Sequence, residues 1–181
     1  MATEFEKKYR LTEKLYEDLA ARLADIGAHY EGEEEEENTI FELTALIGKP
    51  AVLRIRSVGD KTLLTFKRRL ASDTGVKHQI EFETEVSDRA AVSGIIGELG
   101  LAPNVIYEKR RRTWRLADVE VVLDTLPFGL FMEIEGPIES IAEAERKLSI
   151  ENLPVEARTY PNLTAELGKR VGDIIEARFE K

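Results

Sequence analysis

The fold is decided by one stretch near the start of the chain, Thr3-Glu4-Phe5-Glu6-Lys7-Lys8-Tyr9. In a β-strand successive side chains point to opposite faces, so Glu4, Glu6 and Lys8 share one face and the intervening side chains share the other. Two carboxylates about 6–7 Å apart, followed one step further by an ammonium, suit a divalent cation beside an anionic ligand. The same pattern also fits an ordinary solvent-exposed strand, so the remainder of the chain has to decide between the two.

The composition excludes several classes of protein. The chain has 181 residues, 43% of them hydrophobic and 34% charged, which predicts one globular domain over residues 1–181. It has no cysteine, so disulfides and thiolate metal sites are excluded. No apolar run approaches the ~20 residues that a membrane span requires, so we expect a cytoplasmic protein with no membrane partner.

The net charge of −9 is unevenly distributed, because Glu33 to Glu37 supply five negative charges and leave −4 for the rest of the chain. We interpret this glutamate run as a solvated loop that leads into a strand at Ile40-Phe41. The basic cluster Lys109 to Arg112, followed by Trp114, resembles a nucleic-acid patch. The acidic net charge and the alternation of strand faces argue against one, so we expect no nucleic-acid partner.

Hydrophobic periodicity and turn residues predict the order of helices and strands. Helices are predicted from a Thr12 cap to Gly27, from a Ser87 cap to Gly100, over Glu139 to Leu148 and over Pro161 to Phe179. Strands are predicted at Ala51 to Val58, Thr62 to Arg68, Lys77 to Val86, Asn104 to Leu116, Val119 to Leu126 and Phe131 to Glu135. Gly59-Asp60 and Ala117-Asp118 are the turns of two predicted hairpins.

The predicted strands carry charges of one sign on their polar faces. The basic faces hold Arg54, Arg56, Lys67, Lys109 and Arg111, and the acidic faces hold Glu4, Glu6, Asp124, Glu133 and Glu135. These faces can be the solvent side of an open sheet. They can also be the inside of a sheet that curls into a barrel, apolar face outward under helices, where a polyanion and a divalent cation would neutralise both sets of charges.

The order of these motifs resembles a known family. Glu4-Phe5-Glu6-Lys7-Lys8 is similar to the ExExK signature of the CYTH superfamily, the triphosphate tunnel metalloenzymes. Further motifs follow in the family's order: Leu53-Arg54-Ile55-Arg56, Lys67, Glu81-Phe82-Glu83, Lys109-Arg110-Arg111, Asp124, Gly129 to Glu135, and Arg158-Thr159-Tyr160 with Leu163. The resemblance implies an α+β fold with a closed or nearly closed antiparallel barrel of about eight strands, a tunnel with helices packed outside.

The resemblance also implies roles for individual residues. Metal would be held by Glu4, Glu6, Asp124, Glu133 and Glu135, with Mg²⁺ or Mn²⁺ as the cofactor. Phosphate oxygens would be bound by Lys8, Arg54, Arg56, Lys67, Lys109, Arg111 and Arg158, with Glu81 and Glu83 near them. The catalytic residues would be Glu4, Glu6 and Lys8, one of which accepts a proton from the attacking water.

The function implied is a metal-dependent triphosphatase, and two alternatives stay open. A class IV adenylyl cyclase would make cyclic AMP from ATP, and a polyphosphate-binding module would lack catalysis. Gln79 stands where many relatives have Arg, and Pro127-Phe128 precedes Gly129 where an acidic or small residue is usual, so the substrate is left among tripolyphosphate, ATP and thiamine triphosphate. A monomer or a homodimer is equally compatible with the sequence.

Overall fold

The computed structural model describes residues 2–70 and 77–180. In this part of the chain, all strands join one sheet and no helix is long and apolar enough to cross a membrane. The strands are β1 (Ala2–Leu11), β2 (His29–Glu42), β3 (Ala51–Val58), β4 (Lys61–Arg69), β5 (Lys77–Val86), β6 (Val105–Leu116), β7 (Val119–Leu126), β8 (Gly129–Glu135), β9 (Lys169–Val171) and β10 (Ile174–Ala177). The helices are α1 (Glu13–Asp25), α2 (Thr44–Ile47), α3 (Arg89–Glu98), α4 (Ile138–Leu148) and α5 (Tyr160–Leu167).

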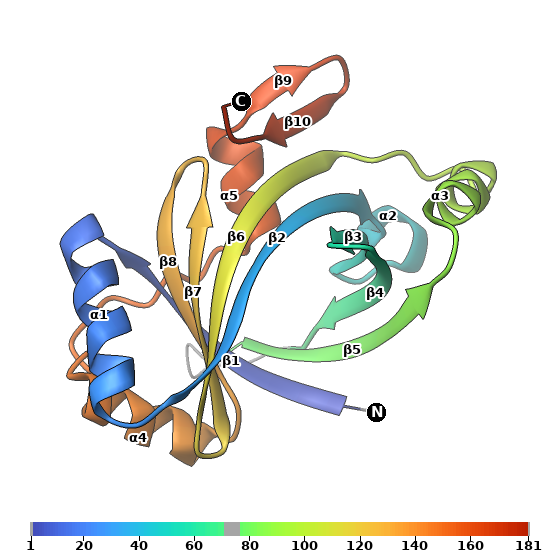
Figure 1. Cartoon of the computed structure of the whole chain (residues 1–181). Helices are drawn as coiled ribbons and strands as arrows, with labels where there is room; N and C mark the ends of the chain where they lie inside the picture. Colours follow the sequence, from blue (N-terminus) through green and yellow to red (C-terminus); the bar gives the residue numbers. More distant parts are fainter. Residues whose placement is uncertain (1, 71–76, 181) are drawn as a thin grey trace.

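The first eight strands form one strongly curled antiparallel sheet (Figure 1). Their order is β2-β3-β4-β5-β1-β8-β7-β6, and β2 pairs with β6 as well as with β3, so the pairings return to their starting strand. The predicted curled sheet of about eight strands is therefore confirmed. It is half-open and not a tightly closed barrel, because β1 divides its length between two partners: Ala2–Glu6 pair with β5, and Glu6–Leu11 pair with β8.

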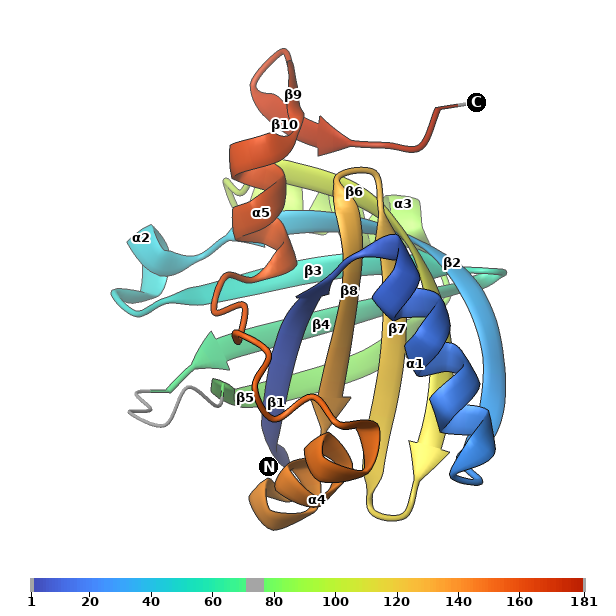
Figure 2. The ribbon, with the colours of Figure 1, turned by 90° about the vertical axis from the view of Figure 1, so that its left-hand side faces the viewer.

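The main hydrophobic core lies outside the curled sheet. Helices α1 and α4 cover the outer face of β1, β7 and β8 (Figure 2), where Leu19, Leu23, Leu123, Ile134 and Leu148 have no exposed surface. Helix α1 begins where predicted, because the side chain of its N-cap residue accepts a hydrogen bond from the third backbone amide after it. With the apolar faces turned outward under helices, the inner faces of the same strands are free to carry charge.

Two smaller clusters fix the other helices. Helix α3 places Ile96 against Phe41 and Ile55 on the outside of β2 and β3. Helix α5 buries Tyr160 and Leu163 among residues of β2, β6, β7 and β8 at one end of the curled sheet (Figure 2). Helix α5 therefore stands at an opening of the interior and not on its outer wall.

The predicted helix from Pro161 to Phe179 is wrong beyond its first two turns. Helix α5 ends at Leu167, and the chain continues as the hairpin β9–β10, which extends the sheet by a parallel pairing of β10 with β6. Gly168 allows this turn: a Cβ there would lie 2.6 Å from the carbonyl oxygen of Thr164 and 2.7 Å from that of Glu176. Gly172 adopts φ +62° in the hairpin turn, a conformation that favours glycine.

The glutamate run is not a loop. It lies inside β2, which pairs with β6 along almost its whole length, so that Glu36 faces Lys109 across the strand pair. Glu33 to Glu35 are exposed, whereas Glu36 is 3% exposed. A smaller correction concerns α3, whose N-cap is Asp88 and not Ser87; its carboxylate accepts from the backbone amide of Ala91.

Candidate functional site

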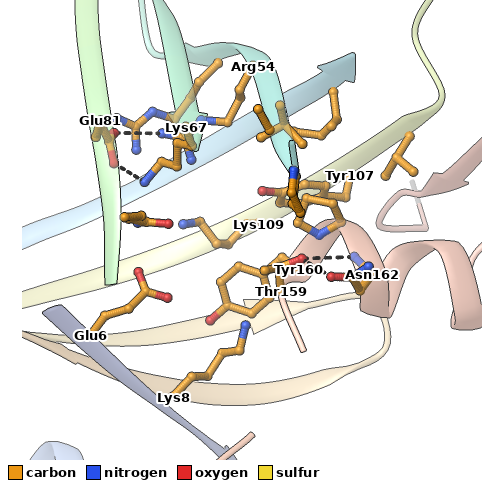
Figure 3. Close-up of a pocket in the computed structure, with 18 of the residues that line it drawn as sticks. Glu6, Lys8, Arg54, Lys67, Glu81, Tyr107, Lys109, Thr159, Tyr160 and Asn162 are labelled. Carbon is orange, nitrogen blue, oxygen red and sulfur yellow. Dashed lines mark hydrogen bonds and ion pairs between the residues drawn. The ribbon is translucent and has the colours of Figure 1, made fainter. Parts of the chain in front are cut away.

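The curled sheet encloses a cavity of about 660 Å³ that opens beside α5 (Figure 3). Most residues predicted from the charged strand faces line it: Glu6, Lys8, Arg54, Arg56, Lys67, Lys109, Arg111, Glu133 and Glu135, together with Glu81 and Glu83. The charged faces thus converge on one interior and are not spread over an outer surface.

Strand register brings these charges together. Glu6 stands directly opposite Glu135 and Lys8 opposite Glu133 in the β1–β8 pairing, and Arg111 stands opposite Asp124 in the β6–β7 pairing. Residues that face each other in neighbouring strands point to the same side of the sheet. A period of two in each strand, combined with this register, is enough to concentrate the charges inside.

The basic wall is formed by β3, β4 and β6. The Nη2 atom of Arg56 donates to a carboxylate oxygen of Glu83 at 3.0 Å, and the Nη2 atom of Arg54 donates to the same oxygen at 3.4 Å. Lys67 forms an ion pair with Glu81. The Nε–H groups of Arg54 and Arg56 are buried and have no hydrogen-bond acceptor in the part of the chain that the structure describes. Buried guanidinium donors without acceptors fit an anionic ligand that supplies the missing oxygens.

The acidic wall is formed by β1, β7 and β8. Burial raises the pKa of Glu135 to about 7, with further contributions from Glu6 and Glu120 that outweigh the opposing effect of Lys67. Such crowded carboxylates fit the donor set of Mg²⁺ or Mn²⁺, because a divalent cation relieves their mutual repulsion. Among the side chains that the structure describes, no three carboxylates or histidines already converge as a complete metal cluster.

A network of buried ion pairs and hydrogen bonds lies beneath the side chains that line the cavity. Asp124 is fully buried and accepts from Arg111 through both oxygens, at 2.8 and 2.6 Å. Arg111 also donates to Glu133 at 2.8 Å, and the Tyr160 hydroxyl donates to Asp124 at 2.8 Å. Burial raises the pKa of Tyr160 well above its usual range, and the nearby carboxylates of Asp124 and Glu133 raise it further against the opposing effect of Arg111, so the hydroxyl remains a donor.

A second buried pair joins β2 to β6. Glu36 lies 3.2 Å from the ammonium of Lys109, 3.7 Å from Arg56 and 4.0 Å from Arg111. Burial alone would raise the pKa of Glu36, but these cations hold it well below its usual range. Burial lowers the pKa of Lys109, and the neighbouring Arg111 adds to this effect. Glu36 therefore counters part of the positive charge that the basic wall gathers.

Comparison with known proteins places this arrangement in a family. A family model described as the CYTH domain matches residues 2–160. The chain belongs to the CYTH domain family. The prediction made from the ordered motifs is thereby confirmed.

Solved structures agree with this membership. The chain is 28% identical to the PH1012 protein of Pyrococcus horikoshii OT3, with a TM-score of 0.78 over 88% of this chain and 98% of the other. It is 27% identical to a conserved hypothetical protein of Pyrococcus furiosus, with a TM-score of 0.77 over 88% and 99%. A Hippeastrum protein, described as an adenylyl cyclase candidate with a dominant triphosphatase activity, shares the fold at 19% identity, with a TM-score of 0.67 over 90% and 93%. No curated protein matches the sequence.

Three predicted residues are placed differently from the rest of the CYTH site. Arg158 does not line the cavity; its guanidinium is paired with Glu156 at 2.6 Å and Glu166 at 2.8 Å. Asp124 lies beneath the lining, and its oxygens are used by Arg111 and Tyr160. Glu4 belongs to β1, but its side chain lies outside the described part of the structure.

Sequence reasoning assigned no role to several residues that build the cavity. Glu36 received no role because the whole glutamate run was interpreted as solvated. Strand alternation nevertheless places Glu36 on the same face as Asn38 and Ile40, which is the inner face. Tyr160 stands in a motif that the resemblance names, yet the motif alone does not show that its side chain enters the interior. Tyr107 and Asn162 complete the lining near α5. Tyr107 precedes Lys109 by two positions, so strand alternation would have placed it on the same face, whereas no spacing in the sequence points to Asn162.

Proposed function

We propose that this CYTH protein hydrolyses triphosphates in the cavity, with Mg²⁺ or Mn²⁺ as cofactor. The observation that carries the proposal is the pair of buried Nε–H groups of Arg54 and Arg56, which have no acceptor among the residues that the structure describes and belong to side chains lining a cavity of about 660 Å³. That volume is within the range of about 300–1,000 Å³ that small-molecule sites have. A chain of phosphates beside a divalent cation matches this division into basic and acidic walls.

The basic residues bind and orient the phosphates. Arg54 and Arg56 offer guanidinium donors for phosphate oxygens, and Lys67 and Lys109 add point charges. Arg111 uses its Nε and Nη2 on Asp124 and would reach a phosphate through its remaining Nη1. Positioning and neutralisation of charge account for most of the catalysis of phosphoryl transfer. The burial of Arg111 and Lys109 strengthens their effect, because water screens a charge less inside the protein than at its surface.

The acidic residues suit the cofactor. Glu6, Glu133 and Glu135, with Glu4 as a further ligand, would hold the cation, which supplies charge neutralisation and an activated water when bound. Lys8 lines the cavity and lies 3.7 Å from a carboxylate oxygen of Glu133, so its ammonium would bind a phosphate oxygen next to the cation. Glu6 is then our candidate to accept the proton of the attacking water.

The Hippeastrum relative supports hydrolysis over cyclisation, because it is described as having a dominant triphosphatase activity. Another structural relative, from Vibrio parahaemolyticus and 17% identical, is named as an adenylate cyclase candidate. Both likenesses are at the level of the fold. An assay of the products that this protein forms therefore has to decide between hydrolysis and cyclisation.

The test is incubation with tripolyphosphate, ATP and thiamine triphosphate, each with Mg²⁺, with Mn²⁺ and with a chelator. We expect metal-dependent release of orthophosphate, and a loss of roughly 100-fold in Glu6→Gln. The matched control is Glu35→Gln, which changes an exposed carboxylate on the outside of the barrel and should keep full activity. Formation of cyclic AMP would favour the cyclase, and tight binding without turnover under any metal would favour the binding module.

A further inference from the structure

Tyr160 connects helix α5 to both walls of the cavity (Figure 3). It is the first residue of α5 and is 6% exposed, so its ring points inward from the opening. Its hydroxyl donates to Asp124 at 2.8 Å, and Asp124 in turn holds the guanidinium of Arg111. Through one hydrogen bond, the position of α5 therefore influences a phosphate-binding residue on β6.

The ring of Tyr160 makes a separate contact with β1. The ammonium of Lys8 lies 4.0 Å from the centre of the ring, and Lys8 is 1% exposed. Phe131 packs edge-on against the same ring at 5.4 Å between centroids, which keeps the ring from turning away. A desolvated ammonium over an aromatic face is held more firmly than one at the surface.

We propose that Tyr160 is a positioning residue that sets the locations of Lys8 and Arg111 together. This inference rests on the proposed function and deepens it. Its hydroxyl orients the Asp124–Arg111 pair, and its ring face orients the ammonium of Lys8. Because Tyr160 begins α5, both contacts depend on the packing of this helix at the opening of the cavity.

Two substitutions separate the two contacts. Tyr160→Phe removes the hydrogen bond to Asp124 and keeps the ring, whereas Tyr160→Leu removes both. The matched control is Tyr9→Phe, because Tyr9 is fully buried and its hydroxyl also donates to a carboxylate, that of Glu145, on the outer face of the sheet. Tyr9→Phe thus loses the same kind of bond without touching the cavity.

The measurements are calorimetric binding of inorganic tripolyphosphate without metal, and kcat and KM with metal. We expect Tyr160→Phe to weaken binding and raise KM about tenfold, as the loss of a hydrogen bond to a charged group predicts. Tyr160→Leu should weaken binding further and also lower kcat about tenfold, because Lys8 is released. Tyr9→Phe should lower stability and leave the affinity and both kinetic constants within twofold of wild type.

The inference is overturned if both Tyr160 variants bind tripolyphosphate within twofold of wild type, or if Tyr9→Phe weakens binding as much as Tyr160→Phe. Should Tyr160→Leu fail to fold, Tyr160→Phe, which keeps the packing, decides alone. A wild-type protein that binds tripolyphosphate but releases no orthophosphate refutes the proposed function, and the affinities of the variants still test the role of Tyr160. Absence of any tripolyphosphate binding refutes both.

Discussion

Replacement of Glu36 by Gln removes a buried negative charge from among the cations of the cavity. The carboxylate is 3% exposed and lies 3.2 Å from the ammonium of Lys109, which is equally buried. Breaking a buried ion pair costs about 3–5 kcal/mol. Because Asp124 remains 3.7 Å from Lys109 and retains part of its charge compensation, we expect a loss of about 2–3 kcal/mol in the free energy of unfolding.

Urea denaturation measures this loss, with the single tryptophan, Trp114, as the probe because it is 3% exposed in the folded protein. The same titration with tripolyphosphate should stabilise Glu36→Gln more than wild type, since the variant cavity carries one more uncompensated positive charge. Glu35→Gln is the control: its exposed pair with Arg110 should change stability by less than about 0.5 kcal/mol. Equal stabilities of the two variants would refute the reasoning.

The dependence on pH gives a second readout of the same change. Burial raises the pKa of Glu36, but Lys109, Arg111 and Arg56 lower it by more, so the folded pKa lies below the ordinary value of 4.5. The contribution of Glu36 to stability is therefore complete above that value and is lost as pH falls toward the folded pKa. Acid titration of stability should be less steep in Glu36→Gln than in wild type.

Three further predictions follow from single residues. Glu135→Gln should raise the metal-free stability at pH 8 by about 1 kcal/mol, because Glu135 is crowded by other carboxylates, while Mn²⁺ binding measured by calorimetry weakens. Arg158→Ala should keep kcat/KM within about threefold, whereas Arg56→Ala, which removes a buried phosphate donor, should lower it by roughly 10-fold or more in steady-state assays. Gly168→Ala should lose about 1–3 kcal/mol in urea denaturation, because its Cβ would meet two carbonyl oxygens, whereas Gly94→Ala on the open face of α3 should gain about 0.5–1 kcal/mol.

The sequence predicts the convergent charges because strand alternation is a local rule. Arg54 and Arg56 share a face whatever their partner strand is, and so do Glu133 and Glu135. Once the outer faces are known to be apolar, the charged faces must lie inside. Which charges share a face needed no knowledge of long-range contacts, whereas their convergence on one cavity depends on the strand pairings and was indicated only by the family resemblance.

The burial of Glu36 and the position of Arg158 outside the cavity lining could not be predicted, because both are set by contacts that the sequence does not display. A run of five glutamates favours solvation, and only the pairing of β2 with β6, 73 positions apart for Glu36 and Lys109, provides the cation that allows burial. Arg158 has the right position in a motif, yet the glutamates at 156 and 166 take its guanidinium. The apolar periodicity across 161–179 likewise predicted a continuous helix, because it does not indicate the close backbone approach at Gly168 where the helix ends.

The register of β1 has a consequence for how the protein forms during synthesis. Strand β1 pairs with β5 and with β8, both of which follow it in the chain, so its partners are complete only when residue 135 has been made. Until then the nascent chain holds an unpaired amphipathic strand, and pairings between such distant segments form slowly and leave edges open to aggregation.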